Sequence, residues 1–172
     1  MPSQKSTSFV EYVLNSIQNQ KSKGFVSKLK KADNELTEYQ SWEILSQWIN
    51  LDYERDRRAY GLIGASLARS KLQSDGLIGL GQALSQVFYQ DGNNGELNNS
   101  PVALRLRRLL ACRDALELIT IMRPILRYLE SKDIPFSRAQ VLDNLLWFDH
   151  DQSRDRIRSR WAQDFFRKKE ES

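Results

Sequence analysis

Arginine is the residue type with the clearest chemical potential in this sequence, and it is concentrated in one stretch. Residues 101–127 contain six arginines but only two acidic residues, Asp114 and Glu117. A guanidinium group holds its N–H donors in a planar fork that matches the oxygens of a phosphate or a carboxylate. The chemistry that this stretch could perform is therefore anion recognition, and we interpret it as a surface for a nucleic-acid backbone.

The distribution of charge along the chain supports this interpretation. The chain has 172 residues and a net charge of +4. Residues 1–100 carry 11 basic and 11 acidic residues, whereas residues 101–172 carry 15 basic and 11 acidic ones, and 12 of those 15 are arginines. The alternative explanation is that these charges only keep exposed helix faces solvated, and composition alone does not decide between the two.

Residues that enzymes use for catalysis are scarce. The chain has one cysteine, Cys112, and one histidine, His150, so it cannot build a zinc site from these two residue types. The helical phase of Cys112 predicts a small hydrophobic residue at the edge of the core. His150 lies between Asp149 and Asp151 and suits a surface ion cluster better than a catalytic base. We therefore expect no catalytic site, no metal and no cofactor.

Two helices are expected to position the arginines of residues 101–127. Ser100 is a suitable N-cap, with Pro101 at the first helical position. Asp114 followed by Glu117 forms a capping box, which starts a second helix directly afterwards. Pro124 lies within that second helix and is predicted to kink it or to split it in two.

Helical spacing of apolar residues continues through the rest of the chain. Capping boxes predict helix starts at Ser8 and Ser137, and Asp151 or Ser153 could cap the last helix. Further helices are predicted at 38–51, at 53–71, from about residue 80, and at 154–168. No segment alternates like a strand, so the predicted fold is all-α, with two small helical bundles packed together. We place them at residues 1–90 and 101–172, on either side of a flexible Gly- and Asn-rich loop at 91–100.

The chain has no run of about 18 apolar residues that could span a membrane. Its first residues, MPSQKSTSFVEY, lack the apolar core of a signal peptide. We therefore expect a cytoplasmic protein with no membrane partner.

Several segments, in order and with matching spacing, resemble a known family. They are LRLRRLLACRD (104–114), LITIMRPILRYLESKDIPFSRAQVLDNLLWF (118–148) and RIRSRWAQDFF (156–166), with weaker matches at 29–32 and 79–84. Together they resemble CasB, the small subunit of the type I-E CRISPR surveillance complex, Cascade. The sequence departs from the family pattern at Leu104, where an arginine is usual, and at Leu106, where an aromatic residue is usual.

The resemblance implies an all-helical protein without catalytic activity. It implies that copies associate head to tail, as a homodimer within the complex, with CasA, CasC, CasD and CasE as further subunits. It also implies contacts with guide RNA and target DNA that help to hold the R-loop and the displaced strand. Base pairing then supplies sequence recognition, and the protein supplies charge and shape.

Ten basic residues are our candidates for contacts with nucleic-acid phosphates. They are Arg107, Arg108, Arg113, Arg123, Arg127, Arg154, Arg158, Lys28, Lys30 and Lys31. Three other functions remain open: a protein–protein scaffold whose arginines pair with acidic partners, a helix-turn-helix transcription factor that prefers one DNA site, and a metal-dependent nuclease.

Overall fold

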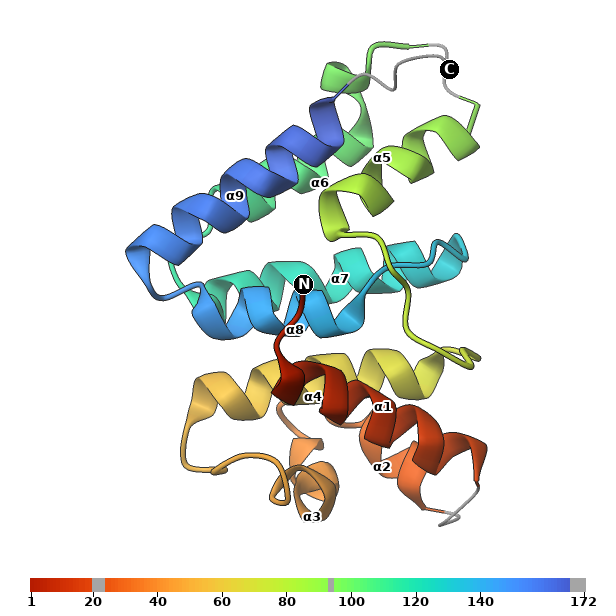
Figure 1. The fold of residues 1–172 in the computed structure, drawn as a ribbon, viewed down its shortest axis with the longest axis vertical. Coiled ribbons are helices and arrows are strands. Elements are labelled where there is room, and N and C mark those ends of the chain that lie inside the picture. Colours follow the sequence, from red (N-terminus) through yellow and green to blue (C-terminus); the bar gives the residue numbers. More distant parts are fainter. Residues whose placement is uncertain (20–23, 93–94, 168–172) are drawn as a thin grey trace.

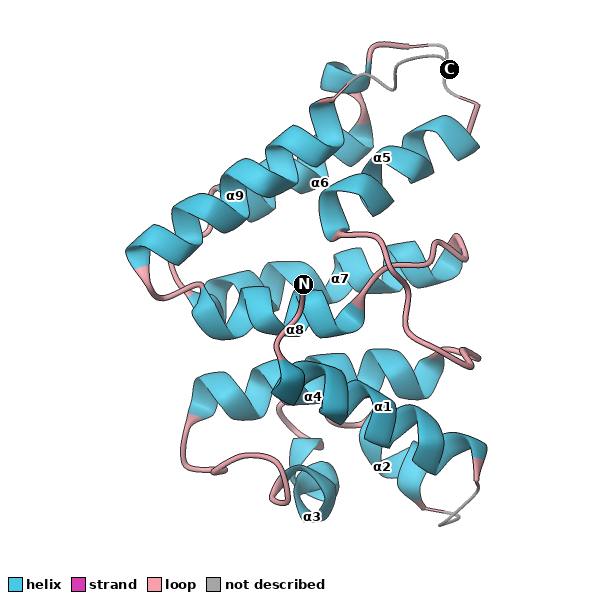
Figure 2. Ribbon diagram, in the orientation of Figure 1, coloured by secondary structure: helices cyan, strands magenta, loops and turns pink. Residues whose placement is uncertain are grey.

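All of the regular secondary structure in the described part of the chain is helical. The computed structural model describes residues 1–19, 24–92 and 95–167, and these contain helices, turns and loops but no strand (Figures 1 and 2). The prediction of an all-α fold is confirmed. Within these residues, no helix is both long and apolar enough to cross a membrane.

The helices lie in three tiers (Figure 1). The lower tier consists of α1 (Gln4–Gln18), α2 (Phe25–Lys30), the 3₁₀ helix η1 (Glu38–Ser41), α3 (Trp42–Leu45) and α4 (Glu54–Arg69). The middle tier consists of α7 (Ala115–Ser131) and α8 (Arg138–Trp147). The upper tier consists of α5 (Leu80–Gln90), the 3₁₀ helix η2 (Leu97–Asn99), α6 (Pro101–Leu110) and α9 (Asp151–Phe166). The middle tier thus contacts both others, through α4 below it and through α6 and α9 above it.

One continuous hydrophobic core joins the three tiers. In the lower tier the ring of Phe9 packs edge-on against Tyr60, with ring centroids 4.7 Å apart. In the upper tier Trp161 and Phe165 are buried. The helix α5 precedes the predicted boundary loop at 91–100 but packs on α9 and α6, which follow it. The division into units 1–90 and 101–172 stays a prediction.

Side-chain caps begin the helices that carry most of the arginines. The hydroxyl of Ser100 accepts a hydrogen bond from the backbone N–H of Ala103 at 3.1 Å, which starts α6. The Asp114 carboxylate accepts one from the N–H of Glu117 at 2.8 Å, which starts α7. Ser137 caps α8 in the same way. These three predicted starts are confirmed.

Other predicted boundaries are wrong for local reasons. Helix α1 begins at Gln4 with Ser3 as its N-cap, ahead of the predicted start at Ser8. The predicted helix 38–51 is interrupted after residue 45. At the break, side chains bond to a nearby carbonyl and compete with the helical pattern, since the Ser46 hydroxyl and the Gln47 side-chain amide both donate to the carbonyl of Glu43, at 3.5 and 3.4 Å.

Helix α7 is not split at Pro124, because it continues as one element from Ala115 to Ser131. Pro124 and Thr120 are both exposed. The Thr120 carbonyl, which lacks the usual N–H donor four residues later, is therefore within reach of water.

Candidate nucleic-acid interface

Three exposed arginines follow one another closely in the chain at the C-terminal end of α6 and just after it. Arg107 and Arg108 belong to its last turn, and Arg113 follows in the short connection to α7. Arg107 donates a hydrogen bond to the backbone carbonyl of Asn98 at 2.6 Å. None of the three side chains forms an ion pair with a carboxylate in the described ranges. We name these three residues the α6 arginine cluster, and its charges are available to an anion from outside.

The next two candidates on α7 have acidic neighbours inside the protein. Arg127 pairs with Asp33, with 3.3 Å between Nη2 and Oδ2. Arg123 is partly buried and lines a narrow cavity together with Asp33, Glu35 and Glu38. Its Nε atom is buried and has no hydrogen-bond partner among the residues that the structure describes. Both arginines face the surface where α7 meets the lower tier.

The two candidates on α9 hold the upper and middle tiers together. Arg154 pairs with Asp151 at 2.5 Å and also donates to the carbonyl of Phe148. Arg158 donates to the backbone carbonyl of Cys112, and its guanidinium lies 5.6 Å from the centroid of the Phe148 ring. These contacts assign both arginines a structural role within the chain.

The three lysine candidates lie in the lower tier. Lys28 forms an ion pair with Glu43. The Nζ atom of Lys31 donates to the side chain of Gln40 at 2.8 Å. Lys30 is exposed and has no hydrogen bond or ion pair within the described part of the chain. Three of the ten candidates thus lie close together in the chain at the end of α6, away from the tier that holds the lysines. Contact with nucleic acid stays a prediction for all ten.

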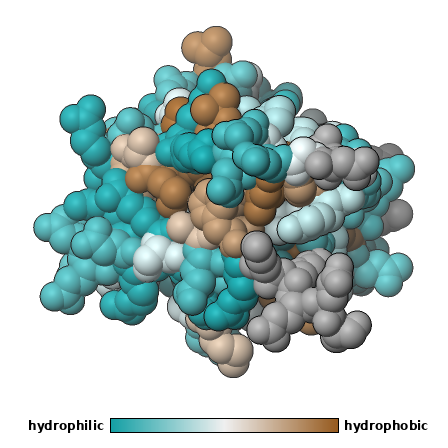
Figure 3. Space-filling view, turned by 90° about the horizontal axis from the view of Figure 1, so that it is seen from above, coloured by the Kyte–Doolittle hydropathy of each residue, from teal (hydrophilic) through white to brown (hydrophobic). Residues whose placement is uncertain are grey.

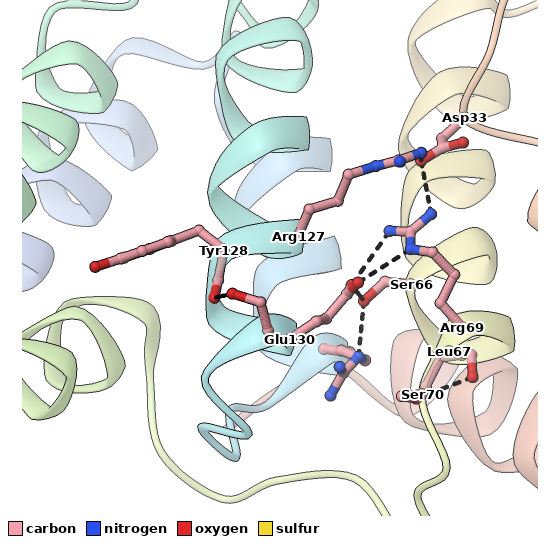
Figure 4. Close-up of polar contacts among 10 residues, drawn as sticks. Asp33, Ser66, Leu67, Arg69, Ser70, Arg127, Tyr128 and Glu130 are labelled. Atoms are coloured by element: carbon pink, nitrogen blue, oxygen red, sulfur yellow. Dashed lines mark hydrogen bonds and ion pairs between the residues drawn. The ribbon is translucent and has the colours of Figure 1, made fainter. Parts of the chain in front are cut away.

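A network of ionic and polar side chains fixes α7 against α4 (Figure 4). Arg69 of α4 donates to the Glu130 carboxylate at 3.0 Å from Nε, and its Nη1 atom lies 2.8 Å from Asp33. The Ser66 hydroxyl donates to Glu130 at 2.6 Å and accepts from the Nε atom of Arg138 at 2.9 Å. We name these five residues, with Arg127 at the rim, the buried ionic network.

Burial and neighbouring charges act differently on two arginines of this network. Burial alone would lower the pKa of Arg69, but its hydrogen bonds to Glu130 and the charges of Glu130 and Asp33 raise that pKa above its ordinary value. Burial lowers the pKa of Arg138, whose Nη1 atom has no hydrogen-bond partner among the described residues. Sequence reasoning missed this network because its members are far apart in the chain and follow no motif.

The only cysteine and the only histidine of the sequence serve the fold. Cys112 is 1% exposed, which confirms the prediction of a core-edge hydrophobic residue. His150 is the N-cap of α9, where its Nδ1 atom accepts a hydrogen bond from the N–H of Ser153 at 3.4 Å. The predicted ion cluster at His150 is wrong, because Asp151 pairs with Arg154 and Asp149 accepts from the N–H of Ala115.

Cys112 is expected to react very slowly with a disulfide reagent in the native protein. Burial raises the pKa of its thiol to about 11, and the sulfur donates to the carbonyl of Arg108. At pH 8 this leaves about one thiol in 1,000 as the reactive thiolate. The release of thionitrobenzoate at pH 8 should therefore be at least about 100-fold slower for the native chain than for the chain unfolded in guanidinium. Equal rates in the two states would contradict this assignment.

The fold belongs to a known class of CRISPR-associated proteins. A chain of a "CRISPR RNA-guided surveillance complex" superposes with a TM-score of 0.74 at 16% identity, and the match covers 94% of this chain and 91% of that one. CasB from Thermobifida fusca gives a TM-score of 0.67 at 17% identity, over 97% and 100% of the two chains. CasB from M. ruber gives 0.65 at 15% identity, over 93% of each chain. The protein thus has the CasB fold.

The sequence identifies the family itself. Residues 26–166 match the family model described as CRISPR-associated protein Cse2, and this range is well over half of the chain. The protein therefore belongs to the Cse2 family. No curated protein matches it in sequence.

Proposed function

We propose that this protein is a non-catalytic small subunit of a type I-E CRISPR surveillance complex. It binds the nucleic-acid backbone without sequence preference and stabilises the R-loop and the displaced strand. Its partners are CasA, CasC, CasD, CasE, guide RNA, target DNA and a second copy of itself, and it works in the cytoplasm with them. Membership in the Cse2 family and the fold shared with a chain of a CRISPR RNA-guided surveillance complex support this role.

The α6 arginine cluster is the observation that carries nucleic-acid binding. Three exposed arginines without carboxylate partners in the described residues belong to the last turn of α6 and to the connection that follows it. Each can form charge-assisted hydrogen bonds to a phosphate, and phosphate contacts carry no information about the base sequence. Such a surface binds any backbone, with an affinity that falls as salt rises.

Replacing Arg107, Arg108 and Arg113 together with alanine is expected to weaken binding equally for unrelated sequences. For a duplex, the slope of log K against log salt should become less steep by about 0.9 for each phosphate that the variant no longer neutralises. Fluorescence anisotropy with two unrelated duplexes, at several salt concentrations, measures both effects. Arg55→Ala is the matched control. Arg55 already pairs with Asp56, so its removal should leave the slope unchanged.

Two outcomes would contradict the proposal. If the triple variant bound every duplex as tightly as the parent at each salt concentration, the α6 arginine cluster would not be the contact surface. If neither protein bound nucleic acid while both still assembled with the other subunits and guide RNA, the protein would be a scaffold whose arginines meet acidic proteins.

A further inference from the structure

An open groove of about 740 Å³ runs between α8 and α9, outside the α6 arginine cluster. Its walls combine one aromatic side chain with two arginines and several side-chain amides. The side chains that could contact a ligand there are Trp147, Asn144 and Gln140 from α8, and Arg156, Arg160 and Gln163 from α9.

Trp147 is unusually exposed for a tryptophan at the end of a packed helix. Its exposed fraction is 58%, whereas its neighbour Phe148 is 0% exposed and Trp161 of α9 is 2% exposed. The two other tryptophans, Trp42 and Trp48, are partly buried. Trp147 has no ring contact with another aromatic or cationic side chain among the described residues. A large part of this aromatic side chain is therefore open to a ligand in the groove that it lines.

Arg156 and Arg160 lie one turn apart on α9 and both line the groove. The guanidinium of Arg156 forms no hydrogen bond or ion pair within the described ranges. Arg160 is 68% exposed and lies 3.9 Å from Asp164, a separation at which a surface pair contributes little. Both charges are available to an anion that enters the groove.

The acidic residue on the opposite wall, Asp143, already accepts hydrogen bonds from within the protein. Asp143 of α8 accepts hydrogen bonds from the hydroxyls of Ser3 and Ser6, at 2.7 and 2.6 Å, and from the backbone N–H of Ser3. These donors hold the carboxylate on the side of α8 that faces α1, and Asp143 is the only acidic residue that lines the groove in the described part of the chain. The two arginines therefore outweigh it, and the groove keeps a positive charge.

We propose that this groove binds an unpaired nucleic-acid strand, with a base stacked on Trp147 and the backbone phosphates held by Arg156 and Arg160. The inference rests on the proposed function and adds a site that selects single strands. An indole face stacks on any base, and arginines beside it contact the phosphates, which gives affinity without sequence preference. A duplex covers the faces of its bases with their neighbours and cannot stack on Trp147 without opening. The amides of Gln140, Asn144 and Gln163 donate to and accept from the exposed base edges.

The test compares Trp147→Ala with the parent on three probes of 15 nucleotides: oligothymidylate DNA, oligouridylate RNA and an abasic DNA of the same length. Trp147→Ala is expected to bind the thymidylate about tenfold more weakly, because alanine offers no ring on which a base can stack. Its affinity for the abasic strand should not change. Binding of thymidylate should quench the tryptophan fluorescence of the parent but not of Trp147→Ala. The RNA probe shows whether the groove accepts both kinds of unpaired strand.

Three further variants separate the contribution of stacking from those of packing and charge. Trp147→Phe keeps an aromatic face and should bind within about threefold of the parent, whereas Trp147→Leu should behave like Trp147→Ala. Arg156→Gln combined with Arg160→Gln should make the salt slope for a single strand less steep by about 1.4, since each phosphate contributes about 0.7. Far-ultraviolet circular dichroism confirms that each variant folds.

Three results would overturn the inference. One is equal affinity of Trp147→Ala and the parent for thymidylate, and another is an equally large decrease in affinity for the abasic strand. The third is that Trp147→Leu no longer assembles with the other subunits but keeps its affinity for strands, which would make the groove a protein contact. If Trp147→Ala binds like the parent while the α6 triple variant does not, only this inference fails. If the parent binds neither strands nor duplexes, the proposed function fails with it.

Discussion

Replacing Glu130 with alanine is expected to lower the free energy of unfolding by about 3–5 kcal/mol. Glu130 accepts hydrogen bonds from both Arg69 and Ser66, and its side chain is only 14% exposed. Its removal leaves the buried charge of Arg69 with Asp33 as its only remaining partner in the network. Denaturation in urea, followed by circular dichroism, measures the decrease, and the melting temperature should fall by about 10 °C.

The charge balance within the buried ionic network predicts that the effects of replacing Glu130 and Arg138 are coupled. The network holds three arginines, Arg69, Arg127 and Arg138, against the two carboxylates of Asp33 and Glu130. Removing Glu130 raises the excess positive charge, so Arg138→Met should be less harmful in the Glu130→Ala background than in the parent. A double-mutant cycle would report this as a favourable coupling energy.

A surface pair provides the matched control for Glu130. Glu54 pairs with Arg58 one turn along α4, and the Glu54 side chain is 47% exposed. Glu54→Ala should cost less than about 1 kcal/mol, because such pairs are solvated and contribute little. If Glu130→Ala were no more costly than Glu54→Ala, the network would not be what fixes α7 against α4.

The sequence predicts the helix starts well wherever the signal is local. A Ser or Asp cap acts on a backbone N–H two or three residues further along, so Ser100, Asp114 and Ser137 can be identified without knowing any tertiary contact. The prediction for the start of α9 is wrong by one residue or more, because Asp151 and Ser153 are both common caps and histidine is a less common choice than either. Local chemistry therefore narrows that start to a few residues but does not fix it.

Such local signals could not predict which arginines are free to contact an anion from outside. Helical phase places Arg154 and Arg158 on one flank of α9 and Arg156 and Arg160 on the other, and the two pairs are equivalent in sequence. Only the folded chain puts the Cys112 carbonyl and Phe148 against the first flank and leaves the second facing the groove. Composition is enough to predict a surface that binds anions. Which arginines form that surface depends on long-range packing.

Figure 3 looks onto the end of the molecule formed by the upper tier and shows hydrophilic surface interrupted by patches of hydrophobic residues. The exposed hydrophobic side chains of the upper tier include Leu104 and Tyr89, which are 50% and 49% exposed. Leu104 lies on α6, one turn before Arg107 and Arg108 of the α6 arginine cluster. Leu104 therefore adds no positive charge next to the cluster. The local positive charge then depends more strongly on each of the three arginines.

Replacing Gly81 with valine is expected to lower the free energy of unfolding by about 3 kcal/mol, because α5 and α9 touch at this glycine. A Cβ atom at position 81 would lie 2.4 Å from the carbonyl oxygen of Trp161 and 3.0 Å from its Cα. Both are backbone atoms, so no side-chain rotation can relieve the clash and the two helices must move apart. Chemical denaturation measures the decrease, and near-ultraviolet circular dichroism reports the displaced Trp161.

Two substitutions separate this clash from the usual effect of adding a side chain to a helix. Gly81→Ala should also destabilise the protein, although alanine favours a helix over glycine by about 1 kcal/mol and propensity alone would predict a gain. Gly95→Ala is the matched control, since a Cβ there would meet no atom within 4 Å. Because Gly95 lies outside any helix and gains no helix propensity, a Gly81→Ala variant about 1 kcal/mol more stable than Gly95→Ala would show that α5 and α9 are not in close contact. The nearest atoms to a Cβ at position 81 all belong to α9. A loss of stability in the Gly81 variants but not in Gly95→Ala would therefore show that α5, which precedes the 91–100 loop, is stabilised by α9, which follows it.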